Sequence, residues 1–150
     1  MLQVFKMSLD SVLVSAIMSK DVKTEVEEQD IGAILRLMDV NDIGSVDIVK
    51  RQDKGQIPVG IITERDIVRT FGRKASDLKE PLTTFMSKPI ITIQSNSSAG
   101  EAMQLMNSNH IRRIVVVDPS AKIVGILTEK DIFREMLKIS GLIDDFTKYG

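Results

Sequence analysis

The sequence predicts a mixed α/β (α+β) fold built from two tandem β-α-β-β-α repeats. Met18-Ser19-Lys20 recurs 68 residues later as Met86-Ser87-Lys88, and residues 60–67 recur at a shift of 65 as residues 125–132. The shift changes within the polar stretch 50–56, where an insertion between two strands is tolerated best. Because each repeat is too small to bury its faces alone, we expect the two to pack face to face about a pseudo-twofold axis.

The first half of each repeat reads as a short strand followed by an amphipathic helix. The strands are expected at residues 22–26 and 90–93. The two helices have apolar residues at the i, i+3, i+4, i+7 spacing of a buried face, namely Ile31, Ile34, Leu35 and Met38, then Ala99, Ala102, Met103 and Met106. Ser98 followed by Glu101 predicts a capping box at the start of the second helix.

The second half of each repeat reads as two apolar strands and a closing helix. The strands are expected at residues 46–49 and 57–62, then at 114–117 and 123–127. The closing helices should begin at Glu64 and Glu129. Asp47 alternates with Val46 and Ile48, so we expect its side chain to face solvent.

The repeats divide the chain at residues 1–75 and 76–150, and the polar segment 72–81 is expected to link them. Residues 1–15 are too apolar for a free tail, so we expect them to form a helix or strand that covers the other repeat. Leu142, Ile143 and Phe146 form a further apolar group, which fits either a core or an interface.

Composition excludes several classes of function. The chain has 150 residues, a net charge of −1, no cysteine and a single histidine, His110. These numbers argue against disulfides, cysteine nucleophiles, His-rich metal sites and a Ser-His-Asp triad. The balanced charge and 4% aromatic content argue against nucleic-acid binding. We see no signal peptide and no membrane span, so a cytoplasmic location is expected.

The residues that could carry chemistry follow the pattern Gly-x-x-Thr-x-x-Asp at both strand-to-helix junctions. They are Gly60, Thr63 and Asp66, then Gly125, Thr128 and Asp131. A helix N-terminus with a hydroxyl suits phosphate, an Asp one turn later could accept both ribose hydroxyls, and the glycine allows close approach to the backbone. Thr-x-x-Asp is also an ordinary helix-capping pattern, and the two interpretations are compatible.

With these motifs in place, the chain resembles a cystathionine-β-synthase (CBS) domain pair, or Bateman module. The likeness covers about residues 16–137 and rests on residues 86–92, 102–106, 110–118 and 125–131, with 17–22 and 58–66 in the first copy. The resemblance implies a regulatory module that binds AMP, ADP, ATP or S-adenosylmethionine in clefts between the repeats, requires no cofactor, and associates as a homodimer.

The resemblance also implies which residues contact the ligand. Thr63, Asp66, Thr128 and Asp131 would hold ribose and phosphate, with adenine against Met18 and Val22 or against Met86, Ile90 and Ile91. The loops at Ile43-Gly44 and Ile111-Arg112 would line the remainder. The basic residues near the expected clefts, together with the proline that follows the second Met-Ser-Lys, complete the candidate set: Lys20, Arg65, Lys88, Pro89, Arg112, Arg113 and Lys130. The Arg112-Arg113 pair is the best candidate for a phosphate clamp.

One leading hypothesis and two alternatives follow, because no catalytic residues and no metal ligands are evident. The first is an adenine-nucleotide sensor that passes its state to an unknown effector protein. The alternatives are an S-adenosylmethionine sensor and a ligand-independent dimerisation or scaffold module, in which the Thr-x-x-Asp motifs only cap helices.

Overall fold

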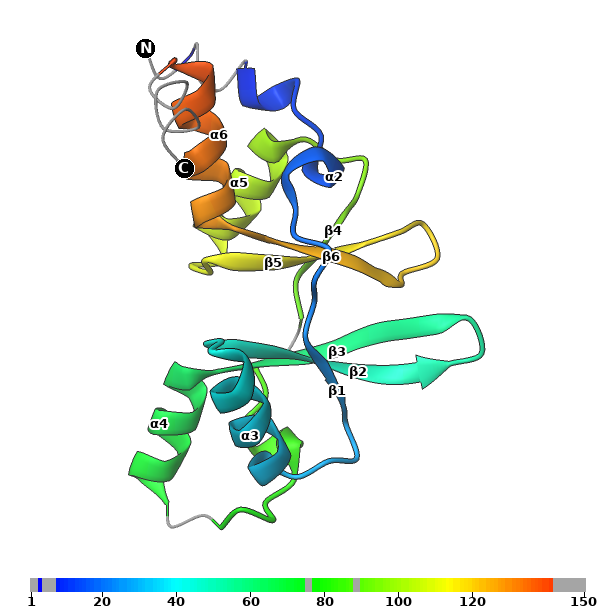
Figure 1. Ribbon diagram of the computed structural model, residues 1–150, viewed down its shortest axis with the longest axis vertical. Helices are drawn as coiled ribbons and strands as arrows, with labels where there is room; N and C mark the ends of the chain where they lie inside the picture. The colour runs from blue at the N-terminus through cyan, green and yellow to red at the C-terminus, as the bar shows by residue number, and fades with distance from the viewer. Residues whose placement is uncertain (1–2, 4–7, 75–76, 88–89, 142–150) are drawn as a thin grey trace. The chain divides into compact units, whose positions relative to one another are not determined.

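The chain folds into two compact units, each built around one repeat (Figure 1). The computed structural model describes residue 3 and residues 8–74, 77–87 and 90–141. Of these described residues, those within 22–90 and 121–123 form the first-repeat unit, and those within 1–21, 91–120 and 124–141 form the second-repeat unit. Lys88, Pro89 and the apolar group at 142–146 lie outside the described residues.

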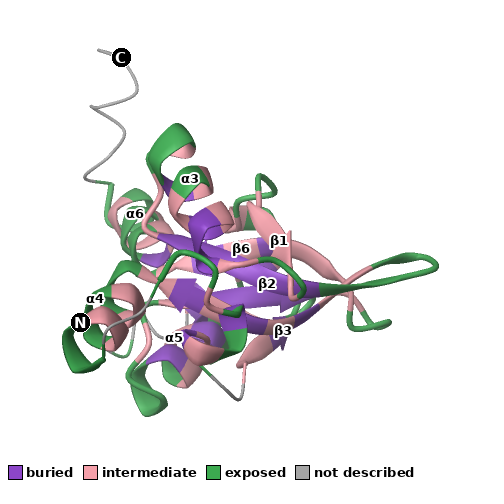
Figure 2. Cartoon of the chain, turned by 90° about the horizontal axis from the view of Figure 1, so that it is seen from below, coloured by how far each residue is buried: buried purple, intermediate pink, exposed green. Residues whose placement is uncertain are grey.

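The first-repeat unit contains a three-stranded sheet and two helices. Its elements are β1 (Thr24–Val26), α3 (Ile31–Asn41), β2 (Ser45–Gln52), β3 (Gly55–Thr63) and α4 (Glu64–Arg73). Strand β2 lies in the middle, parallel to β1 and antiparallel to β3. Ile34, Ile48 and Ile62 are fully buried in the core between sheet and helices. Along β2 the chain passes from buried residues to an exposed end (Figure 2).

The second-repeat unit repeats this architecture, so the mixed α+β class and its duplication are confirmed. Its elements are β4 (Thr92–Gln94), α5 (Ala99–Ser108), β5 (Arg113–Val117), β6 (Ile123–Thr128) and α6 (Glu129–Ile139), with the short helix α2 (Val14–Ile17) in front. Strand β5 lies in the middle, and β4 runs parallel to it. Ile114, Val116 and Leu127 form its core with residues of α5 and α6.

The leading segment of each repeat packs onto the unit of the other repeat. Leu9 and Val14 are fully buried in the second-repeat core, and the Val14 N–H donates to the carbonyl of Ser97 at 2.8 Å. Leu82, in the 3-10 helix Leu82–Thr84, and Phe85 are buried in the first-repeat core. Over residues 8–15, the expectation that the leading segment covers the other repeat is therefore confirmed.

The segment 72–81, expected to link the two repeats, follows α4, and its described residues lie in the first-repeat unit. The N–H groups of Ile31 and Gly32 donate to the carbonyls of Glu80 and Leu78, each at 3.0 Å, so this segment belongs to the first-repeat unit. The chain passes from one compact unit to the other near residues 21–22 and 90–91, and residues 121–123 are grouped with the first-repeat unit. A polar surface segment of this kind can be held in place by backbone hydrogen bonds without apolar side chains.

The prediction for Asp47 is wrong. Its side chain is buried, with 2% of its surface exposed. It stands on the middle strand, paired with Thr24 of β1 and Ile61 of β3, and its N–H donates to the carbonyl of Lys23 at 3.2 Å. Alternation identified one face of the strand correctly, but the opposite face of this sheet is covered too.

Candidate ligand-binding sites

Thr63 and Asp66 form a reciprocal capping box at the start of α4. Asp66 Oδ2 accepts hydrogen bonds from the Thr63 N–H at 2.9 Å and from the Thr63 hydroxyl at 2.8 Å. The Asp66 N–H donates in return to Thr63 Oγ1 at 3.2 Å. The two residues thus satisfy donors that the first turn of the helix would otherwise leave unpaired.

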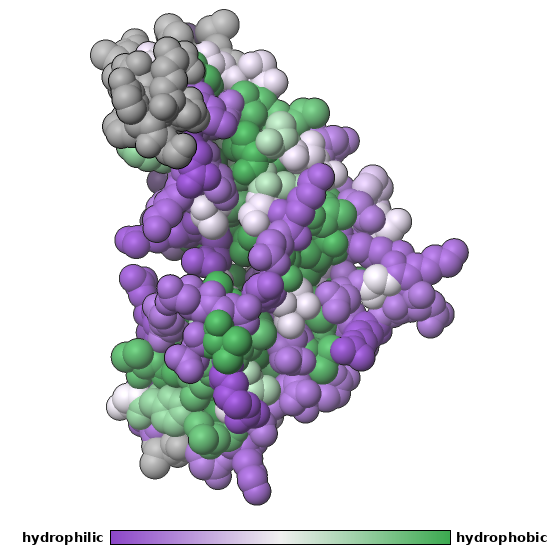
Figure 3. Space-filling view, in the orientation of Figure 1, coloured by the Kyte–Doolittle hydropathy of each residue, from purple (hydrophilic) through white to green (hydrophobic). Residues whose placement is uncertain are grey.

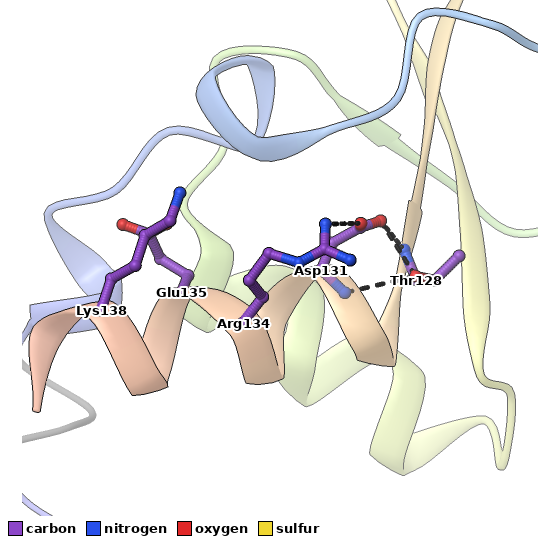
Figure 4. A network of polar contacts seen from close by, with 5 residues as sticks. All are labelled: Thr128, Asp131, Arg134, Glu135 and Lys138. Atoms are coloured by element: carbon purple, nitrogen blue, oxygen red, sulfur yellow. Dashed lines mark hydrogen bonds and ion pairs between the residues drawn. The ribbon is translucent and has the colours of Figure 1, made fainter. Parts of the chain in front are cut away.

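Thr128 and Asp131 repeat this geometry at the start of α6 (Figure 4). Asp131 Oδ2 accepts from the Thr128 N–H at 2.8 Å and from its hydroxyl at 2.9 Å. The capping interpretation is therefore confirmed in both copies. Capping engages Oδ2, so a ligand contact in either copy would fall to Oδ1.

The second carboxylate oxygen has a different partner in each unit. Asp66 Oδ1 accepts a hydrogen bond from the Ser87 hydroxyl at 3.2 Å. Asp131 Oδ1 faces the guanidinium of Arg134 at 3.8 Å, and the Arg134 side chain is 63% exposed (Figure 4). Both contacts are long, and an incoming hydroxyl could displace either of them.

Each junction is crossed by a Met-Ser segment from the leading segment of the other repeat. The N–H of Ser87 donates to the carbonyl of Ile61 at 3.1 Å, whereas Ser19 and Ile126 exchange two backbone hydrogen bonds of 2.9 Å. The methionine before each serine lies against the glycine of the motif. A β-carbon on Gly60 would lie 2.7 Å from the Met86 sulfur. The glycine therefore admits a close neighbour, as predicted, and that neighbour is methionine.

A loop between helix and middle strand completes each junction. The N–H of Glu64 donates to the carbonyl of Gly44, and that of Glu129 donates to the carbonyl of Arg112, both at 3.0 Å. The structure thus brings Ile43, Gly44 and Met86 to Thr63 and Asp66. It brings Met18, Ile111 and Arg112 to Thr128 and Asp131.

The remaining candidate residues are less closely associated with the carboxylates. Lys20 and Arg65 are exposed, and Val22, Ile90, Ile91 and Arg113 are half-buried. Lys130 borders a groove of about 640 Å³ between α5 and α6, with Met103 and Phe133. Asp131, the next residue of α6, borders a different groove, because the side chains of consecutive residues in a helix point about 100° apart.

That second groove lies between α2 and α6 and has a volume of about 380 Å³. Val12, Ala16 and Ile17 contribute apolar surface to it, while Asp131 and Arg134 contribute charge. Arg134 and Ser87 were not among the predicted site residues. The repeats could have indicated both, because each copy has an arginine three residues after the Asp, at 69 and 134, and the serine belongs to the repeated Met-Ser-Lys.

Two absences concern the described part of the chain alone. Every helix there is too short or too polar to traverse a bilayer. No group of three or more His, Cys, Asp or Glu side chains in the same part is placed to hold a metal ion.

Two copies of one β-α-β-β-α fold, each with a capped Thr-x-x-Asp junction, define a tandem-repeat module. The model of the CBS domain matches residues 14–73 and again residues 78–138. The chain therefore belongs to the CBS domain family, and it contains a pair of these domains.

Curated relatives share this region. An uncharacterized protein of Methanopyrus kandleri is 36% identical over 125 residues, which cover 83% of this chain and 62% of that protein. An inosine-5'-monophosphate dehydrogenase of Methanocaldococcus jannaschii is 29% identical over 115 residues, which cover 77% of this chain and 22% of the dehydrogenase. The chain thus spans less than two thirds of the length of these relatives.

Solved structures share the fold. The CBS domain pair of protein MJ0100, in complex with 5'-methylthioadenosine and S-adenosyl-L-methionine, is 27% identical with a TM-score of 0.71, covering 83% of this chain and 98% of that one. A CBS domain protein of Pyrobaculum aerophilum, complexed with AMP, is 23% identical with a TM-score of 0.74, covering 85% and 99%.

Proposed function

We propose that this chain is a non-catalytic regulatory module that binds adenosine-containing ligands and signals their presence to an effector protein. AMP, ADP and ATP are the proposed ligands of the module, and its two adenosine sites are proposed at Thr63–Asp66 in one unit and at Thr128–Asp131 in the other. We further propose that the module acts as a cytoplasmic homodimer. The size of the assembly can be measured by light scattering on a gel-filtration column.

One observation carries the proposal: each Asp carboxylate uses one oxygen for its helix cap and presents the other to a weaker contact. For Asp66 that contact is a serine hydroxyl at 3.2 Å, and for Asp131 it is a guanidinium at 3.8 Å. A ribose hydroxyl can replace either partner without unwinding the helix. The adenosine ligands bound by the domain pair of MJ0100 support this choice of ligand class.

Two other functions use the same residues. An S-adenosylmethionine sensor would need the same ribose contact but would bind a cation in place of phosphate. A scaffold module would use the capping boxes for stability alone. The apolar residues that reach the surface over α3 and α4 (Figure 3), among them Val40 and Val68 with 82% and 72% exposed, would suit a scaffold.

Calorimetric titration of Asp66→Ala and Asp131→Ala with AMP, ADP, ATP and S-adenosylmethionine tests the proposal. Each substitution should weaken binding at its own site and lower the number of sites per chain. Each substitution also removes a helix-cap acceptor, so the control variant must lose a comparable cap away from the proposed site. Asp30→Ala does this in the first-repeat unit, since Asp30 Oδ1 accepts from the Ala33 N–H at 3.0 Å.

Glu101→Ala is the matched control in the second-repeat unit, because Glu101 closes the capping box of α5 through the Ser98 N–H at 2.8 Å. Both controls should lose stability and keep ligand binding. Equal affinity in the parent and in both Asp variants would refute the carboxylate assignment. No binding of any ligand to the parent would favour the scaffold.

A further inference from the structure

The two candidate sites are built alike but differ in charge. The loop before the middle strand reads Asp42-Ile43-Gly44-Ser45 in the first-repeat unit and His110-Ile111-Arg112-Arg113 in the second. These loops are equivalent in space as well as in sequence. Asp42 and His110 both adopt left-handed backbone, with φ of 51° and 53°, and each loop accepts a hydrogen bond from the first residue of the following helix.

The difference amounts to three charges in four residues. The first-repeat loop has one acidic residue and no basic one, whereas the second-repeat loop has two arginines and no acidic residue, with His110 counted as neutral. On the closing helices the charged positions match: Glu64 with Glu129, Arg65 with Lys130, and Arg69 with Arg134. The crossing segments differ by Asp21, which corresponds to Pro89 and leaves a net contrast of two charges between the junctions. The contrast therefore comes from the loops.

Contacts at the junctions reinforce the contrast. The carboxylate oxygen that takes no part in the cap also has a different partner in each unit. Asp66 Oδ1 contacts a neutral hydroxyl, whereas Asp131 Oδ1 contacts a guanidinium. A phosphate would meet repulsion at the first junction and attraction at the second.

Building on the proposed function, we propose that the two sites take different classes of adenosine ligand. The second-repeat site takes a phosphate-bearing nucleotide, with Arg112 as the main determinant. The first-repeat site takes an adenosine ligand without phosphate. A single chain would then compare the concentrations of two metabolite classes instead of counting one ligand twice.

Calorimetry with AMP and adenosine, on variants that keep one site each, tests this division. Asp66→Ala leaves the second-repeat site, where AMP should bind at least tenfold more tightly than adenosine. Asp131→Ala leaves the first-repeat site, where adenosine should bind at least as tightly as AMP. If either alanine variant unfolds, the isosteric Asp66→Asn or Asp131→Asn replaces it.

A charge exchange then identifies the determinant. In the Asp66→Ala background, Arg112→Gly should lower the preference for AMP by about three- to tenfold, the range expected for one partly screened charge. In the Asp131→Ala background, Gly44→Arg should raise AMP affinity by a similar factor. The position is open to this change, because the nearest side-chain contact is the flexible end of Glu64. Arg51→Gly, which removes an exposed arginine of β2, should change neither ratio.

The outcomes separate this inference from the proposed function. If neither AMP nor adenosine binds the parent chain, both fail. If both ligands bind but with one AMP-to-adenosine ratio at the two sites, the proposed function stands and the division of ligands is wrong. The division is equally wrong if Arg112→Gly changes AMP binding in the Asp131→Ala background rather than in the Asp66→Ala background.

Discussion

The sulfur of Met18 packs against Gly125, so closely that a β-carbon added at Gly125 would lie only 2.5 Å from it. The two residues are 107 positions apart, and the antiparallel bridge between Ser19 and Ile126 holds them together. The second Thr-x-x-Asp junction is thus closed by the segment that leads into β1 of the first repeat. Met86 stands in the same relation to Gly60.

Gly125→Ala should destabilise the protein by about 1–3 kcal/mol, because the added methyl group overlaps the Met18 side chain and the backbone carbonyl of Ser19 at 2.9 Å. The midpoint of chemical unfolding measures the effect. Gly72→Ala is the control: nothing lies within 4 Å of its β-carbon, and an alanine inside α4 should stabilise by about 0.5–1 kcal/mol. A neutral Gly125→Ala would show that the Met18 contact is loose.

Phe85→Ala should destabilise the first-repeat unit by about 3–5 kcal/mol, the usual loss for a buried phenylalanine. Phe85 is 2% exposed, and its ring centroid lies 5.5 Å from that of Phe71. Phe133→Ala is the matched control, since Phe133 is 61% exposed and should change the unfolding free energy little. Similar losses in the two variants would contradict the assignment of residues 82–85 to the first-repeat core.

Arg134→Gln should change the unfolding free energy by less than about 0.5 kcal/mol, because its pairing with Asp131 is long and mostly exposed. Its removal should nevertheless weaken AMP binding by a few fold at the second-repeat site. Lys138→Gln is the control, because Lys138 pairs with Glu135 at the same distance of 3.8 Å and is 54% exposed. Equal AMP affinity in the two variants would remove Arg134 from the site.

Saturating AMP should raise the melting temperature of the parent chain. At 100 times the dissociation constant, a single site adds about 2.7 kcal/mol of stability, which corresponds to several degrees for a protein of this size. Differential scanning fluorimetry is sufficient, with GTP as the control nucleotide. A melting temperature unmoved by every adenosine ligand would support the scaffold function.

The order of elements, the duplication and the helix caps could all be predicted from the sequence. The reason is that these features depend on near neighbours: helical spacing repeats within one or two turns, and each capping box joins residues three apart, as in Thr63 with Asp66. The Thr-x-x-Asp motifs and the need for their glycines could be predicted in the same way.

The contacts between segments far apart in the chain became evident only in the tertiary structure. Nothing local to Met18 or Ser87 indicates that the first closes the Thr128 junction and the second contacts Asp66. Nothing local to Asp47 indicates that both faces of its strand are covered. Such contacts join residues far apart in the chain, and they form because each small unit must bury its sheet with whatever segment the connectivity delivers there.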